Sequence, residues 1–186
     1  MLDVVDVGIG EKAMIRRIAL ILLLLLAAPF AAQAQWVEHR PPGAGYRIEF
    51  PRTPTTSSQD VPTDVGTVKL YHATVEIGQT MAFVALHNVF PAGSVKDPKA
   101  ALDRGRDGAL RAPSRKLVEE RRMTVSGAPA TRLVVEETKQ GLILIALIVV
   151  SGDNMYQAIF VSPKGGENSP DGQRFLSSLA LVGMVR

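Results

Sequence analysis

The sequence predicts an α+β fold in which a mostly antiparallel β-sheet is flanked by two helices. Most of the chain after residue 35 consists of segments that alternate apolar and polar residues, the pattern of half-buried strands. Short turns join these segments, which favours antiparallel pairing. Two segments begin like helices instead, at Asp97-Pro98 and Ser169-Pro170. The run Leu142–Val150 is apolar throughout, which suits an inner strand covered on both faces.

Four strands are predicted before the first helix: Trp36–His39, Tyr46–Phe50, Thr67–Ile77 and Met81–Phe90. The last two are expected to form a hairpin through the tight connection Gly78-Gln79. The segment Thr53–Thr63 is polar and carries prolines, so it is predicted to be a loop.

The first helix is predicted to begin at Asp97, because an acidic side chain can cap the first turn and Pro98 suits the first helical position. Pro113 is expected to end it. Four strands follow: Lys116–Val125, Ala130–Thr138, Leu142–Val150 and Met155–Ser162. Ser169 is expected to cap the final helix, which would turn Phe175, Leu176 and Leu179 inward.

Residues 1–34 are predicted to be a signal peptide, followed by a single domain over residues 35–186. Two arginines precede the apolar run Ile18–Phe30, and Ala32 and Ala34 supply the small residues of a cleavage site, the order found in secretory signals. The acidic residues before Met14 are unusual in such a signal, so translation is expected to start at Met14. An uncleaved leader that anchors the protein in the envelope is the alternative. The run is shorter than the roughly 20 residues of a spanning helix, so no stable transmembrane anchor is expected after cleavage.

The net charge and the cysteine content limit the possible binding partners and the possible cellular compartment. The net charge is only +3 and aromatic residues make up 5% of the chain, which argues against nucleic acid as a partner. There is no cysteine, so neither a disulfide nor a lipid attached to cysteine can form. With the predicted signal peptide, this favours a periplasmic or secreted protein that folds without disulfides.

Four motifs, in this order, resemble the PsbP-like domain superfamily. They are Trp36 with Gly45–Pro51 (Gly-Tyr-Arg-Ile-Glu-Phe-Pro), the turn Gly127-Ala128-Pro129-Ala130, the pair Met155-Tyr156, and Arg174–Leu179. The resemblance implies a PsbP-like α/β/α sandwich. It also implies a binding or assembly role, because known members, which include the extrinsic photosystem II subunit and a Ran-binding import factor, act mainly in that way. No functional residue of those members matches a motif here.

Histidines are the candidate metal ligands, and they are few. His39, His72 and His87 do not form a zinc motif, so no metal, cofactor or catalytic residue is predicted. The alternative is a metal-binding protein or enzyme in which His72 and His87, on adjacent strands, share a face with Glu76. No Gly-x-Ser-x-Gly or phosphate-binding loop is present in the sequence.

A basic stretch is the candidate docking site. Arg111, Arg115 and Lys116 lie between the first helix and the next strand, with no acidic residue between Gly108 and Val118. They could dock an acidic partner or anionic lipid headgroups, or they could form an ordinary solvated face. The function predicted overall is an exported, soluble, non-catalytic binding or assembly module whose partner is an unidentified protein or envelope component.

Cleavage after Ala34 should give a mature chain that begins at Gln35. Mass spectrometry of the protein isolated from its native envelope checks this. A mature chain that retains Leu20–Leu26 would contradict it.

Overall fold

The computed structural model describes residues 35–64 and 66–183. The chain divides into two units, Met1–Ala34 and Gln35–Arg186, and the description below concerns the second. The predicted signal peptide, its cleavage site at Ala32 and Ala34, and the predicted start at Met14 therefore lie outside the described residues.

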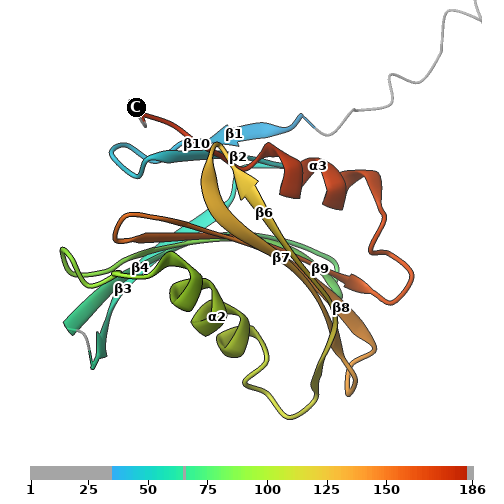
Figure 1. Cartoon of the computed structure of the whole chain (residues 1–186). Coiled ribbons are helices and arrows are strands. Elements are labelled where there is room, and N and C mark those ends of the chain that lie inside the picture. The colour runs from blue at the N-terminus through green and yellow to red at the C-terminus, as the bar shows by residue number, and fades with distance from the viewer. Residues whose placement is uncertain (1–34, 65, 184–186) are drawn as a thin grey trace, which may run out of the picture. The chain divides into compact units, whose positions relative to one another are not determined.

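The largest element is a seven-stranded sheet in which every neighbouring pair is antiparallel (Figure 1). The strand order is β3-β4-β5-β9-β8-β7-β6. Its strands are β3 (Thr55–Thr63), β4 (Gly66–Ile77), β5 (Met81–Val89), β6 (Arg115–Val125), β7 (Ala128–Glu137), β8 (Leu142–Ser151) and β9 (Asn154–Pro163).

Each face of this sheet has its own cover (Figure 1). Helix α2 (Pro98–Ala109) packs on one face, mainly against β7 and β8. The other face carries helix α3 (Pro170–Ser178) and a small three-stranded sheet. The strands of the small sheet are β1 (Val37–His39), β2 (Tyr46–Phe50) and β10 (Ala180–Leu181). The predicted antiparallel sheet between two helical layers is confirmed.

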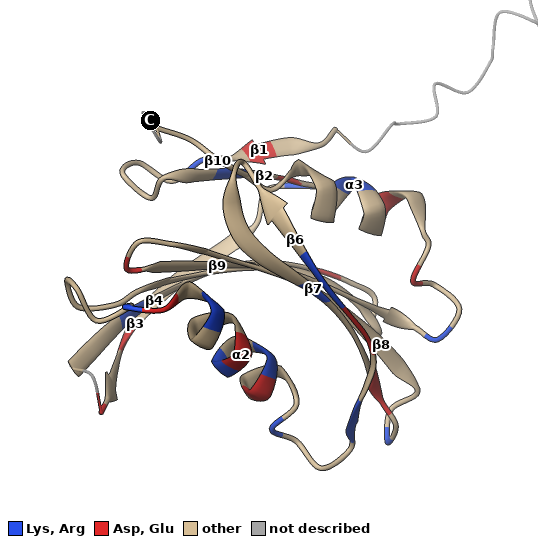
Figure 2. Ribbon diagram, viewed as in Figure 1, with Lys and Arg blue, Asp and Glu red and all other residues tan. Residues whose placement is uncertain are grey.

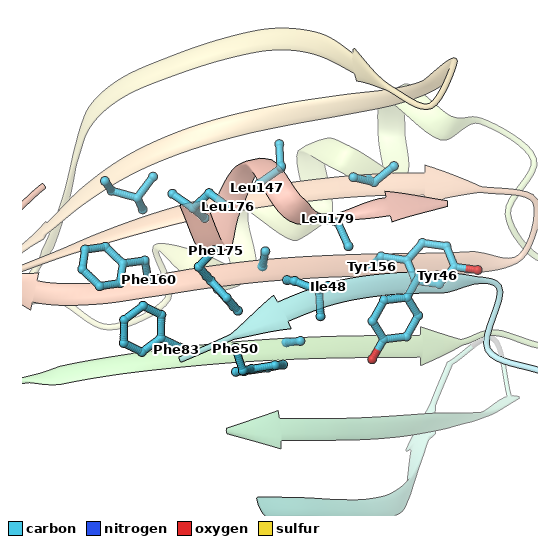
Figure 3. Packing of buried hydrophobic residues seen from close by; sticks show 14 of the residues in the cluster. Tyr46, Ile48, Phe50, Phe83, Leu147, Tyr156, Phe160, Phe175, Leu176 and Leu179 are labelled. Carbon is cyan, nitrogen blue, oxygen red and sulfur yellow. The ribbon is translucent and has the colours of Figure 1, made fainter. Parts of the chain in front are cut away.

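Two hydrophobic clusters hold the layers together. On the face that carries α3, the ring centroids of Phe83 and Phe160 lie 5.1 Å apart, and those of Phe50 and Phe175 also lie 5.1 Å apart (Figure 3). On the opposite face, Ala101 and Leu102 of α2 pack against a second set of apolar sheet residues. Strand β8 contributes to both clusters, which explains why its sequence is continuously apolar.

The helix caps occur where the sequence predicts them. The Asp97 carboxylate accepts a hydrogen bond from the backbone N–H of Lys99 at 2.8 Å, and the Ser169 hydroxyl accepts one from the N–H of Gly172 at 3.2 Å. Each cap satisfies an N–H that the first helical turn leaves without a partner.

The predicted loop over Thr53–Thr63 is wrong, because Thr55–Thr63 forms the edge strand β3. Nearly all of its residues are exposed, so the strand has no apolar face and shows no alternation. Pro62 is tolerated because a proline can stand in an edge strand. The two-residue strand β10 is also absent from the sequence-based prediction; it is too short to show a period.

No helix within the described residues is both long enough and apolar enough to cross a membrane.

Replacing Gly172 by alanine should destabilise the fold, because a Cβ there would collide with the ring of Phe160. We expect a loss of about 1–3 kcal/mol, the usual cost of overpacking a core. Gly108→Ala is the matched control, since a Cβ at Gly108 in α2 meets nothing within 4 Å; it should be neutral or stabilising by up to about 1 kcal/mol. Urea unfolding measures both, and equal effects would contradict the tight contact of α3.

Candidate functional site

A groove of about 760 Å³, called here the α2 groove, lies between α2 and the sheet. Because α2 packs on β7 and β8, it leaves part of the same face open on the neighbouring strands. Leu70, Leu86 and Ile159 line this part and stay half-buried. The groove therefore has an aliphatic floor that the chain itself does not fully cover.

Arginines surround this apolar floor. Arg104, Arg111 and Arg115 line the groove, whereas Asp64 is the one acidic residue among its described lining residues. Arg104 and Arg111 are exposed, and neither forms an ion pair with any other residue that the structure describes. Arg115 is engaged: its Nη1 donates to the carbonyl of Ala109 at 2.9 Å, and its Nε lies 3.5 Å from a Glu137 oxygen.

The other arginines near α2 are neutralised. Arg106 lies 3.5 Å from Asp103, 2.9 Å from Asp107 and 3.6 Å from Glu120, between charged atoms. Arg122 of β6 pairs with Asp103 and with Glu120. Figure 2 shows these opposite charges close together along α2 and β6. Arg104 and Arg111 thus differ from Arg106 and Arg122 in having no ion pair within the described part of the chain, and both line the groove.

The structure separates the three residues of the predicted docking site. Arg111 and Arg115 line the α2 groove. Arg115 is in register with Glu137, and Lys116 is in register with Glu136. Consecutive side chains of a strand point to opposite faces, so Lys116 projects away from the groove. Lys116 therefore does not line the groove with Arg111 and Arg115, and the docking role of the three residues stays a prediction.

Arg104 belongs to this site although the sequence analysis does not select it. It lies within α2, seven residues before Arg111, which follows the end of the helix; both residues line the groove. Gly105 and Gly108 lie between them and also line the groove. This spacing of basic and small residues was the available signal.

A second groove, of about 770 Å³ and called here the tyrosine groove, lies on the opposite face of the sheet. Tyr71, His87 and Tyr156 are directly opposite one another on β4, β5 and β9. Their rings form a stack: the centroids of Tyr71 and His87 are 5.6 Å apart at an interplanar angle of 25°, and those of His87 and Tyr156 are 4.6 Å apart at 14°. Tyr46 lies beside Tyr156, with 5.4 Å between centroids (Figure 3).

Burial keeps His87 and Tyr46 uncharged near neutral pH. His87 is buried, and its Nε2–H donates to Oδ1 of Asn154 at 2.8 Å. Burial lowers the pKa of His87, an effect that the Asn154 hydrogen bond partly opposes. Burial, together with Tyr156, raises the pKa of Tyr46 to about 12. The stack can therefore bind through its rings and hydrogen bonds rather than through charge.

The hypothesis that His72 and His87 share a face is wrong. A two-residue turn would pair Ile77 with Thr80 and bring both histidines to one face. The observed register pairs Ile77 with Met81, so His72 lies opposite Leu86 while His87 lies opposite Tyr71. The one additional residue in the turn shifts the register, so the side chains of β5 point to the opposite face from the one that a two-residue turn would give. No group of three or more potential metal-ligating side chains occurs among residues 35–64 and 66–183.

Comparison with known proteins supports the fold assignment. No protein-family model matches the chain, and no curated protein is similar to it in sequence. Among solved structures, cyanobacterial PsbP (CyanoP) from Synechocystis sp. PCC 6803 is 10% identical, with a TM-score of 0.52 over 82% of this chain and 95% of that one. The chain therefore has the PsbP-like fold that its motifs predict.

Two further solved structures align with most of the chain. PA94 from Pseudomonas aeruginosa, a protein of unknown function, is 13% identical with a TM-score of 0.45 over 81% of this chain and 99% of that one. A protein from Bacteroides thetaiotaomicron is 15% identical with a TM-score of 0.37 over 79% of this chain and 48% of that one.

Mild acid should weaken the fold through His87. Because burial lowers the pKa of His87 below its usual 6.5, the unfolded chain binds more protons than the folded chain below about pH 6.5. The free energy of unfolding should therefore fall as the pH drops from 7.5 to 5.5.

In His87→Gln this fall should be smaller, with a residual part from His39, whose pKa burial also lowers; the double variant His39→Gln/His87→Gln should be the least sensitive. Urea unfolding at several pH values measures the slope. An unchanged slope in His87→Gln would contradict the buried, neutral imidazole.

Proposed function

We propose that this protein is an exported, non-catalytic binding module that holds an amphipathic anion, an aliphatic chain with an acidic head, in the α2 groove. The observation that carries the proposal is the aliphatic floor beside Arg104 and Arg111, which form no ion pair within the described part of the chain.

The floor suits the aliphatic part of such a ligand. Leu70, Leu86 and Ile159 remain half-buried, so a chain laid over them would remove apolar surface from water at roughly 25 cal/mol per Å². A volume of about 760 Å³ is within the range of about 300–1,000 Å³ found for small-molecule sites.

The arginines suit the acidic head. A guanidinium group can donate two parallel hydrogen bonds to a carboxylate or phosphate. Arg104 lies within α2 and Arg111 just after its end, and Gly108 between them has no side chain to obstruct a headgroup. Arg115 is held by Glu137 and the Ala109 carbonyl, so it is not a free donor for the headgroup.

Two sequence features support the remaining parts of the proposal. The predicted signal peptide supports export, to the periplasm or beyond, where fatty acids and lipid fragments of the envelope are available as ligands. The PsbP-like resemblance supports binding rather than catalysis. The uncleaved-leader alternative concerns residues 1–34 and is decided by the mass of the native chain.

Laurate should bind the purified, delipidated protein, and calorimetric titration measures its affinity. Arg104→Gln/Arg111→Gln should weaken laurate binding about tenfold, or about 1.4 kcal/mol, while the binding of uncharged dodecanol is unchanged. Leu86→Asn should weaken the binding of both laurate and dodecanol, because it makes the floor of the groove polar.

Arg121→Gln is the matched control for the arginine pair. Arg121 is an exposed arginine of β6 in register with Arg132, and it does not line the α2 groove. Its replacement should leave both affinities unchanged. Laurate binding that is equal in the wild type and in Arg104→Gln/Arg111→Gln, or absent in the wild type, would overturn the proposal.

A further inference from the structure

We propose that the tyrosine groove is a second binding site, which takes a planar aromatic acid against the exposed face of Tyr71. The inference concerns the opposite face of the sheet from the α2 groove and does not depend on the proposed function. It rests on a row of stacked rings that stops one strand before the edge of the sheet.

Four residues occupy one row across four adjacent strands. Ser58 of β3 is directly opposite Tyr71, Tyr71 is opposite His87, and His87 is opposite Tyr156. Neighbouring strands are about 4.8 Å apart, close to the 5.6 and 4.6 Å between successive ring centroids. The row therefore provides a ring at each strand until it reaches Ser58, whose short side chain cannot cover Tyr71.

Tyr71 has one face without a ring partner. Its described ring contact is with His87, and the residue is 42% exposed. Both Tyr71 and Ser58 line the tyrosine groove. A planar ring placed over Ser58 would continue the stack at the same spacing, which is the offset parallel arrangement that aromatic pairs favour.

The stack is held rigidly from the other side. His87 is buried and its Nε2–H is bound to Asn154, while Tyr46 packs against both His87 and Tyr156, at 5.7 and 5.4 Å between centroids. A ligand would thus meet a preformed surface, which lowers the entropic cost of binding.

The charges around the tyrosine groove determine which kind of planar ligand it favours. Glu38 lies 3.3 Å from Arg47 and is compensated by it, whereas Arg40, which is exposed and lines the groove, makes no ion pair in the described part of the chain. The resulting positive potential disfavours a guanidinium ligand, which would otherwise also stack on tyrosine. It favours an aromatic ring that carries a carboxylate, with the hydroxyl groups of Thr56 and Ser58 available as donors.

The test uses 2-naphthoate as the probe and cyclohexanecarboxylate as its non-planar counterpart. Titration followed by the NMR signals of the Tyr71 ring should show saturable naphthoate binding, at least tenfold tighter than that of cyclohexanecarboxylate. Tyr71→Ala should weaken naphthoate binding at least tenfold, and Tyr71→Phe should preserve it because the ring remains; for the alanine variant the ligand's own fluorescence reports binding.

A second variant tests the empty position directly. Ser58→Phe places a fourth ring beside Tyr71 and should block naphthoate binding; Ser58 is exposed on an edge strand, so this change should leave the melting temperature nearly unchanged. Arg104→Gln/Arg111→Gln should bind naphthoate as the wild type does, which separates this site from the α2 groove. The absence of naphthoate binding by the wild type, or binding that persists equally in Tyr71→Ala and Ser58→Phe, would overturn the proposal.

Discussion

Strand β8 has to be buried on both faces, and the rest of the structure is arranged around this requirement. Its side chains alternate between the two clusters: Ile145 and Val149 pack under α3 and the small sheet, and Ile148 and Val150 pack on α2. Each face therefore needs a cover at this position. Helix α2 approaches the sheet closely at Gly105, because a Cβ there would lie 3.2 Å from Ile148.

The covers are smaller than the sheet, and this difference produces both grooves. A helix with the twelve residues of α2 is about 18 Å long, whereas seven strands span about 29 Å. Since α2 is centred on β7 and β8, the strands on the β3 side of the sheet receive less cover. The α2 groove opens on one face of that region and the tyrosine groove on the other. Binding sites at these positions use sheet surface that the covering elements do not bury.

Local patterns in the sequence predicted most of the fold. Alternation located the strands that have one buried face, and Asp97 and Ser169 marked both helix starts. The same reasoning failed for β3, whose residues are exposed on both faces and are paired only because β4 lies beside them. It also failed for the face shared by His72 and His87, since that depends on a single residue in the turn between β4 and β5.

The candidate sites were predictable only in part, for the same reason. Arg111 and Arg115 stood out as neighbours in the sequence, and Arg104 could have been added from its place in the predicted helix just before them. The ring stack could not be found in this way, because Tyr71, His87 and Tyr156 come from three strands whose order in the sheet is set by long-range pairing.

Strand β3 connects the stability of the fold with its proposed second site. An edge strand exposes unpaired backbone groups, and proteins limit edge-to-edge association with prolines and charged side chains. The polar sequence of β3, with Asp60 and Pro62, meets this need. A large aromatic residue at position 58 would complete the stack but would add exposed apolar surface to the edge. Ser58 avoids that exposure, and as a consequence one face of Tyr71 stays open to a ligand.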